Sequence, residues 1–208
     1  MMISSAVVDF LGVMVLILGF AVIAENFIHS LIRHLQLQSL LLAVLIGVVG
    51  LQMKLPELYA LGILTAIFRG WIIPEILIKD IKEDEVWEHR ELSTSAKHTL
   101  VVGIIGAFCG MVLYSGIYPI LGTWRAEIPF ILLIIGLLII VLRKNAIAQI
   151  SGYIVEENAL LYMGVILAPV SFLLEIGILL DIIGAVMLAV ILSAEKEYGP
   201  LEIDELSG

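Results

Sequence analysis

Ionisable residues inside long apolar stretches are the residues of this 208-residue sequence that indicate chemistry. A charge in the middle of a bilayer costs at least about 2.5–3.5 kcal/mol, so such residues usually pair, face water or carry ions. The third, sixth and seventh apolar stretches each contain two of them. They are Arg69, Glu75, Glu156, Glu157, Glu175 and Asp181. We take these residues as the candidates for ion translocation.

Glu157 and Asp181 are predicted to lie at nearly the same depth. Their stretches are consecutive and joined by a tight turn at Pro169, which makes the two helices antiparallel neighbours. Each acid is about 11 to 12 residues from that turn, and every helical residue rises ~1.5 Å. Two facing acids repel, so one of them is expected to hold a proton near neutral pH. Arg69, at a similar depth, is their expected counter-charge.

Two interpretations of this set are possible. In the first, the residues only pair and fix the register of the helices. In the second, they line a proton or cation route through the bundle. Pairing with Arg69 requires one or two acids, and the sequence supplies more, so the ion route explains the surplus better.

A second group lies near the expected cytoplasmic end of the first stretch. Glu25, His29 and Arg33 are each four residues apart, a spacing that aligns them on one helix face. A salt-bridge ladder at the membrane interface is the favoured interpretation. Glu25, His29 and His34 are the alternative candidates for a proton relay, because histidine titrates near pH 7.

Several chemistries find no support. Cys109 is the single cysteine, and the histidines have no spacing typical of a metal or haem site, so no metal or other cofactor is predicted. The net charge of −9 argues against nucleic-acid binding. No nucleophile motif is present, so we expect a conduit or scaffold and not an enzyme on its own.

The composition predicts an all-α integral membrane protein, because 61% of the residues are hydrophobic and only 15% are charged. Seven stretches approach the ~20 residues needed to span a bilayer. They are 6–28, 37–53, 58–78, 99–121, 128–142, 146–168 and 170–193.

Basic residues predict the orientation. The first, third and fifth connections and the tail hold eight Lys and Arg residues, whereas the alternate loops hold two, Lys54 and Arg125. The N-terminus is therefore expected outside and the C-terminus in the cytoplasm. The polar loop 79–97 is expected to be a solvated cytoplasmic connector or, because it contains Trp87, a docking strip for a soluble partner.

The segment 143–163 resembles the HyfE family, the membrane component E of hydrogenase complexes of the formate hydrogenlyase type. The last stretch, at 173–187, and the third, with Thr65, Arg69 and Pro74, are similar to that family as well, although lysine is expected in place of Arg69. The residues that carry the resemblance in the first segment are Arg143, Lys144, Gln149, Gly152, Glu157 and Asn158.

The last three stretches are similar to subunit K of respiratory complex I. This resemblance implies a three-helix unit in 127–193. The hydropathy pattern predicts four N-terminal helices before it, in 1–126, and an acidic cytoplasmic tail after it, in 194–208. The resemblance places Glu157 in the role of the middle-helix glutamate, and Asp181 or Glu175 in that of the last helix, with Asp181 preferred for its depth. Glu156 stands where an apolar residue is expected, which leaves open whether Glu156 or Glu157 faces the ion route.

The resemblance implies a non-catalytic subunit in the membrane arm of a hydrogenase complex in the plasma membrane. Its partners would be lipid, antiporter-like and other complex I-like membrane subunits, and soluble nickel–iron and iron–sulfur subunits. The ion would be a proton or sodium. A stand-alone transporter or antiporter and a purely structural membrane anchor are the alternatives.

Overall fold

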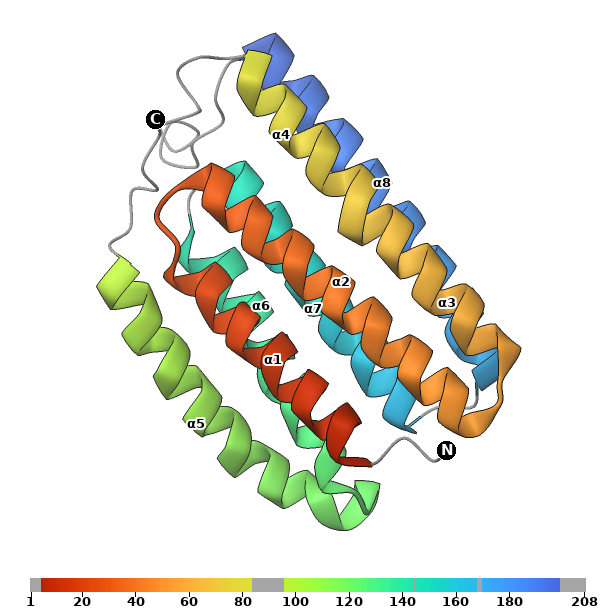
Figure 1. The fold of residues 1–208 in the computed structure, drawn as a ribbon. Coiled ribbons are helices and arrows are strands. Elements are labelled where there is room, and N and C mark those ends of the chain that lie inside the picture. Colours follow the sequence, from red (N-terminus) through yellow and green to blue (C-terminus); the bar gives the residue numbers. More distant parts are fainter. Residues whose placement is uncertain (1–4, 84–95, 144, 168–169, 199–208) are drawn as a thin grey trace.

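The computed structural model describes residues 5–83, 96–143, 145–167 and 170–198, and its elements there are all helical (Figure 1). The helices are α1 (Ser5–Ala24), α2 (Ile28–Met53), α3 (Pro56–Ile67), η1 (Phe68–Ile72), α4 (Ile73–Glu83), α5 (Ala96–Leu121), η2 (Trp124–Ala126), α6 (Glu127–Leu142), α7 (Ala146–Leu167) and α8 (Val170–Tyr198). The centre of the predicted loop 79–97, the turn at Pro169 and most of the tail 194–208 lie outside the described residues.

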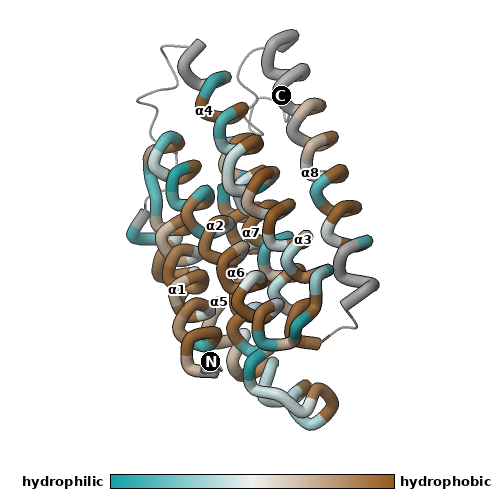
Figure 2. The backbone as a smooth tube through the Cα atoms, turned by 45° about the vertical axis from the view of Figure 1, so that its right-hand side comes forward, coloured by the Kyte–Doolittle hydropathy of each residue, from teal (hydrophilic) through white to brown (hydrophobic). Residues whose placement is uncertain are grey.

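Six helical segments of the described chain are long and apolar enough to cross a membrane. They are Ala6–Ala24, Ile28–Met53, Pro56–Lys79, Lys97–Leu121, Trp124–Leu142 and Ala146–Leu167. Their shafts are largely hydrophobic, with hydrophilic residues concentrated towards the ends (Figure 2). The seventh predicted span falls on α8, a helix of 29 residues. These six helices are consistent with a multi-pass membrane protein. The seventh span and the orientation stay predictions.

The first helix break lies earlier than the sequence predicts. The first span was expected to reach residue 28 and the second to begin at residue 37, but α1 ends at Ala24 and α2 begins at Ile28. The Glu25 side chain turns back on the backbone and accepts hydrogen bonds from the N–H groups of Asn26 and Phe27. This local bonding competes with a continuing helix. The expected single face carrying Glu25, His29 and Arg33 therefore does not form.

The third predicted span is one rod with a π turn in its middle. α3 passes into η1, where the N–H of Ile73 donates to the carbonyl of Phe68, five residues earlier, and the rod continues as α4. Pro74 follows immediately and has no N–H to donate. A proline is a recognised cause of such a disturbance. The π turn contains Arg69, and single-turn π segments are frequent at functional sites.

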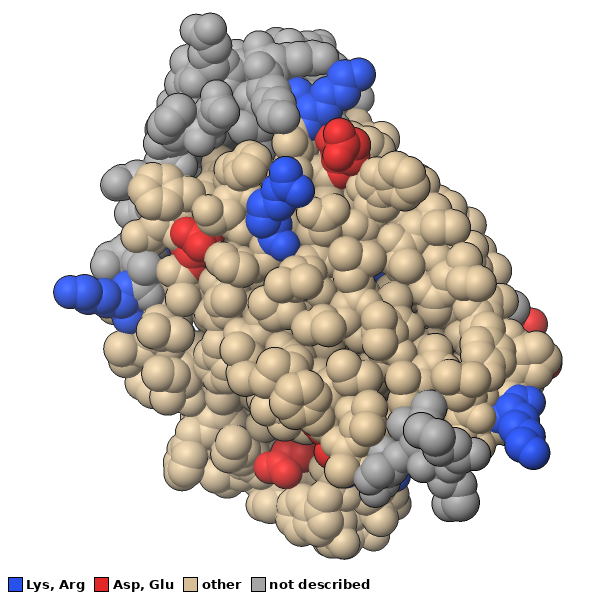
Figure 3. Space-filling model, viewed as in Figure 1, with Lys and Arg blue, Asp and Glu red and all other residues tan. Residues whose placement is uncertain are grey.

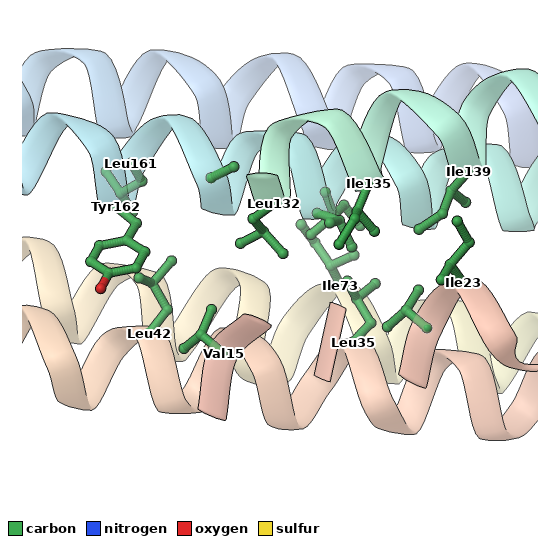
Figure 4. Close-up of a cluster of buried hydrophobic side chains, with 14 of the residues drawn as sticks. Val15, Ile23, Leu35, Leu42, Ile73, Leu132, Ile135, Ile139, Leu161 and Tyr162 are labelled. Carbon is green, nitrogen blue, oxygen red and sulfur yellow. The ribbon is translucent and has the colours of Figure 1, made fainter. Parts of the chain in front are cut away.

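α2 and α7 occupy the centre of the bundle, with α3, α4 and α8 on one side and α1, α5 and α6 on the other (Figure 1). Buried aliphatic side chains of α1, α2, α6 and α7 interdigitate along this centre, as Leu35, Leu132 and Ile135 show (Figure 4). α6 and α7 approach closely at Gly136 and Gly152, where a Cβ on Gly136 would lie 2.7 Å from the backbone nitrogen of Glu156. Small residues permit such backbone contact in membranes.

Charged side chains of the described residues gather towards the two ends of the bundle in the space-filling view, and other residues form almost all of the middle of that face (Figure 3). Three of the candidate charges, Arg69, Glu157 and Asp181, are instead buried between the helices.

Candidate functional site

Arg69 is at the centre of a buried polar cluster. Its side chain extends from the π turn, and its Nε donates to Oδ1 of Asp181 on α8 at 2.6 Å. Its Nη2 lies 3.5 Å from Oε2 of Glu157 on α7. Arg69 and Glu157 are each 1% exposed and Asp181 is 8% exposed. The structure thus brings together three of the six sequence candidates, which we call the buried triad.

The charges of the buried triad do not balance when both acids are ionised, because one guanidinium faces two carboxylates. Asp181 holds the short, charge-assisted hydrogen bond. The Tyr153 hydroxyl, one turn before Glu157 on α7, approaches the Glu157 carboxylate. Neither oxygen of that carboxylate accepts a hydrogen bond of normal geometry from the described residues. An uncompensated buried charge is costly, so the site favours one further positive charge at Glu157.

Gly184 provides the space in which the Glu157 carboxylate lies. A Cβ on Gly184 would be 3.4 Å from each of the two Glu157 oxygens. Gly184 is three residues after Asp181 on α8, so both residues face the same side of that helix. The sequence reasoning did not find Gly184, because nothing in the sequence shows which residue of α8 meets Glu157.

A chain of neutral polar groups leads from the triad across the bundle. Asn158 Oδ1 accepts from Arg69 Nη1 at 3.3 Å. Asn158 Nδ2 donates to Gln38 Oε1 at 3.3 Å and to Ser39 Oγ at 2.9 Å. Gln38 Nε2 then donates to the carbonyl of Val15 on α1 at 3.3 Å.

The donor-to-acceptor direction of this series of hydrogen bonds is fixed by the groups at its two ends. Arginine only donates and a backbone carbonyl only accepts, so the amide orientations of Asn158 and Gln38 follow from these partners. A Cβ on Gly19 would lie 3.2 Å from Gln38 Nε2, so the glycine leaves room for the amide beside α1. Asn158 was noticed in the sequence only as part of the resemblance, and Gln38 and Ser39 were missed. The sequence signal that could have identified Gln38 and Ser39 is their polarity within an otherwise apolar helix.

The other three candidates lie away from the triad. Glu156 is half-buried on α7 with its backbone against α6, so Glu157 is the acid of that pair that faces Arg69. Glu175 is exposed on α8, and Glu75 is exposed on α4. Because α2 and α4 are antiparallel and Gln36 contacts Gly70, Glu75 lies near the level of Leu31, close to the beginning of α2.

Among the described residues, fewer of the candidate acids are buried than the sequence set contains, and the roles of Glu75, Glu156 and Glu175 stay predictions. Apolar neighbours in sequence do not show whether a helical residue faces the bundle or its surroundings. The structure buries two of the five candidate acids, Glu157 and Asp181, and places their charges around one arginine.

The group around Glu25, near the expected cytoplasmic end, is organised differently from the prediction. Oε2 of Glu25 lies 3.4 Å from Nδ1 of His34, and not of His29. The buried Arg143 donates to the carbonyls of Ile23 and Glu25 at 2.8 and 2.6 Å and so ties the α1–α2 turn to the end of α6. Burial lowers the pKa of Arg143 from its ordinary value, and Glu25 opposes this effect. This group therefore has a clear structural role.

No group of three or more His, Cys, Asp or Glu side chains in the described part of the chain is arranged to hold a metal ion. Cys109 is exposed on α5. The buried triad is an arrangement of two acids around one base, which becomes neutral when one further positive charge is present at Glu157.

The comparisons with known proteins give one weak similarity. The chain is 23% identical over 211 residues to the uncharacterized protein Rv0085 of Mycobacterium tuberculosis, and the alignment covers 97% of this chain and 95% of that protein. No family model and no solved structure matches the chain. The similarity extends along nearly the full length of both proteins.

Proposed function

We propose that this protein is a non-catalytic membrane-arm subunit of an ion-translocating hydrogenase complex of the formate hydrogenlyase type. The buried triad would take part in moving protons or sodium ions, coupled to hydrogen evolution. The hydrogenase part of the proposal rests on the resemblance of segment 143–163 to the HyfE family. The observation that supports ion translocation is the excess of one acid over one base at Arg69, Glu157 and Asp181. Arg69 and Glu157 lie on helices apolar enough to cross a membrane, and Asp181 lies on α8, which contacts both of them.

The charge imbalance gives the site two states. With a cation at Glu157 the triad is neutral, and without it the site carries one buried negative charge. The second state is costly in isolation but is stabilised when a positive charge approaches from a neighbouring site. A subunit of this kind is suited to exchange charge with partners on either side and needs no catalytic group of its own.

The polar chain through Asn158 and Gln38 supports a role that extends across the bundle. It connects the triad, near α8, to the backbone of α1 on the other side of α2 and α7. The triad therefore has a hydrogen-bonded connection to α1, on the other side of the bundle. Antiporter-like membrane subunits are the proposed neighbours, with soluble nickel–iron and iron–sulfur subunits elsewhere in the complex and the plasma membrane as the location.

Isolation of the chain from native membranes in a mild detergent tests this proposal. We expect it to co-purify with hydrogenase and antiporter-like subunits, identified by mass spectrometry. A chain that migrates alone or as a homo-oligomer would contradict the complex and favour a stand-alone transporter. If the complex is found, Glu157→Gln separates ion translocation from a purely structural anchor, since an anchor predicts unchanged coupling.

A further inference from the structure

The residue after Arg69 has a backbone carbonyl that lacks its usual helical partner. In an α-helix, the carbonyl of Gly70 would accept a hydrogen bond from the N–H of residue 74. That residue is Pro74, which has no N–H. The carbonyl adjoins the π turn that carries Arg69, so its bonding bears on the direction of the Arg69 side chain.

A side chain from α2 supplies the missing donor. Nε2 of Gln36 donates to the Gly70 carbonyl oxygen at 3.0 Å. The approach depends on the glycine, because a Cβ at position 70 would lie 2.5 Å from Cδ2 of Leu40, one turn after Gln36 on α2. Gly70, Pro74 and Gln36 therefore form one arrangement, in which the proline frees a carbonyl and the glutamine binds it.

The π turn sets the direction in which Arg69 points. It contains one residue more than an α-helical turn, so its loss would rotate Arg69 by about 100° relative to α4. Such a rotation would carry the guanidinium away from Asp181, with which it makes the 2.6 Å bond. A contact that stabilises the backbone at Gly70 thus also stabilises the ion pair.

We infer that Gln36 is a positioning residue for the buried triad: it holds the π turn at Gly70 and thereby keeps Arg69 on Asp181 and Glu157. Its importance for ion translocation rests on the proposed function. Its effect on Arg69 does not, and the following experiment measures that effect on the isolated full chain.

The experiment observes Arg69 directly. The protein is labelled with ¹⁵N-arginine, purified in detergent, and the Nε–H signals of its five arginines are recorded by NMR. The Arg69 signal is identified by its loss in Arg69→Lys. In Gln36→Met, which retains the length of the side chain but not its donor, we expect the Arg69 Nε proton to exchange with water at least about tenfold faster, because the ion pair opens more often.

Gln149→Met is the matched control. Nε2 of Gln149 also donates to a backbone carbonyl, that of Arg143, at 2.8 Å. Its loss removes the same kind of bond at a site away from Gly70, so Arg69 exchange should stay at the wild-type rate. An unchanged Arg69 signal in Gln36→Met, or an equal change in both variants, would overturn the inference.

Pro74→Ala provides the rescue. The alanine restores an N–H that can bond to Gly70, so Gln36→Met should have a smaller effect on Arg69 exchange in the Pro74→Ala background. Equal effects in both backgrounds would contradict the proposed coupling. If Gln36→Met alone does not fold, recovery of folding in the double variant supports the inference and continued failure to fold overturns it.

Discussion

Asp181 and Glu157 share one guanidinium but contact it differently. Asp181 accepts a hydrogen bond from Nε of Arg69 at 2.6 Å, whereas the Glu157 carboxylate lies 3.5 Å from Nη2 and against Gly184. The first contact is a structural ion pair. The second leaves a carboxylate that can gain and lose a positive charge without breaking the first.

This difference predicts opposite effects of two conservative substitutions on stability. Glu157→Gln leaves Arg69 and Asp181 as a balanced pair, so the free energy of unfolding should be unchanged or higher. Asp181→Asn removes the charge that accepts the short bond, and should lower the free energy of unfolding by about 1.5–3 kcal/mol. Unfolding in mixed detergent and SDS measures both values. Equal destabilisation by the two variants would contradict the assignment.

The residues of the buried triad could be predicted from the sequence because their depth in the membrane can be estimated. Helical rise converts a count of residues from a turn into a depth, and this places Glu157, Asp181 and Arg69 at one level. The sequence does not show which face of a helix is exposed. Glu75 and Glu175 were therefore included among the candidates although both are exposed. Gly184 and Gln38 could not be predicted, because their roles depend on which residue of another helix lies opposite.

At the scale of the elements, the helix ends depend on local polar bonding that the hydrophobic pattern does not show. Glu25 ends α1 by bonding to the N–H groups of Asn26 and Phe27, although no glycine or proline marks the break. The π turn could not be predicted either, because Pro74 indicates that the helix is irregular there but not that it forms a π turn. The close contact of α6 and α7 depends on two glycines from different helices.

The glycine contact gives a prediction for helix packing. Gly136→Ala places a methyl group 2.7 Å from the backbone nitrogen of Glu156, so the helices must separate. We expect a loss of about 1–3 kcal/mol in the free energy of unfolding. Gly47→Ala is the control on α2, where a Cβ would meet nothing within 4 Å. It should be neutral or stabilising by up to ~1 kcal/mol, and a loss equal to that of Gly136→Ala would argue against the packing role.

At the scale of the whole molecule, α7 lies between α2, α6 and α8, and this position explains why its acid is buried. The composition and apolar lengths were sufficient to predict a helical membrane protein. They were not sufficient to predict which helices meet, because apolar faces directed to lipid and to other helices have similar compositions. Exposed apolar side chains on α5 and α8 suit contact with lipid or with other membrane subunits.

The orientation is tested with cysteines at opposite ends of one span. Glu57 and Lys79 are both exposed and separated by about 33 Å along the rod formed by α3, η1 and α4. In a Cys109→Ser background, Glu57→Cys should react with a membrane-impermeant thiol reagent added to intact cells. Lys79→Cys should react only after the membrane is opened. The reverse pattern would place the N-terminus in the cytoplasm.

We propose that Glu157 carries the translocated charge, and ion uptake by membrane vesicles that contain the native complex measures this role. The measurement compares wild type, Glu157→Gln and the control Gln149→Met during hydrogen evolution, with proton and sodium uptake followed in parallel. We predict that Glu157→Gln assembles and evolves hydrogen but loses most of the ion gradient, while Gln149→Met retains it. A full gradient in Glu157→Gln vesicles would contradict the account and leave the buried triad a structural ion pair.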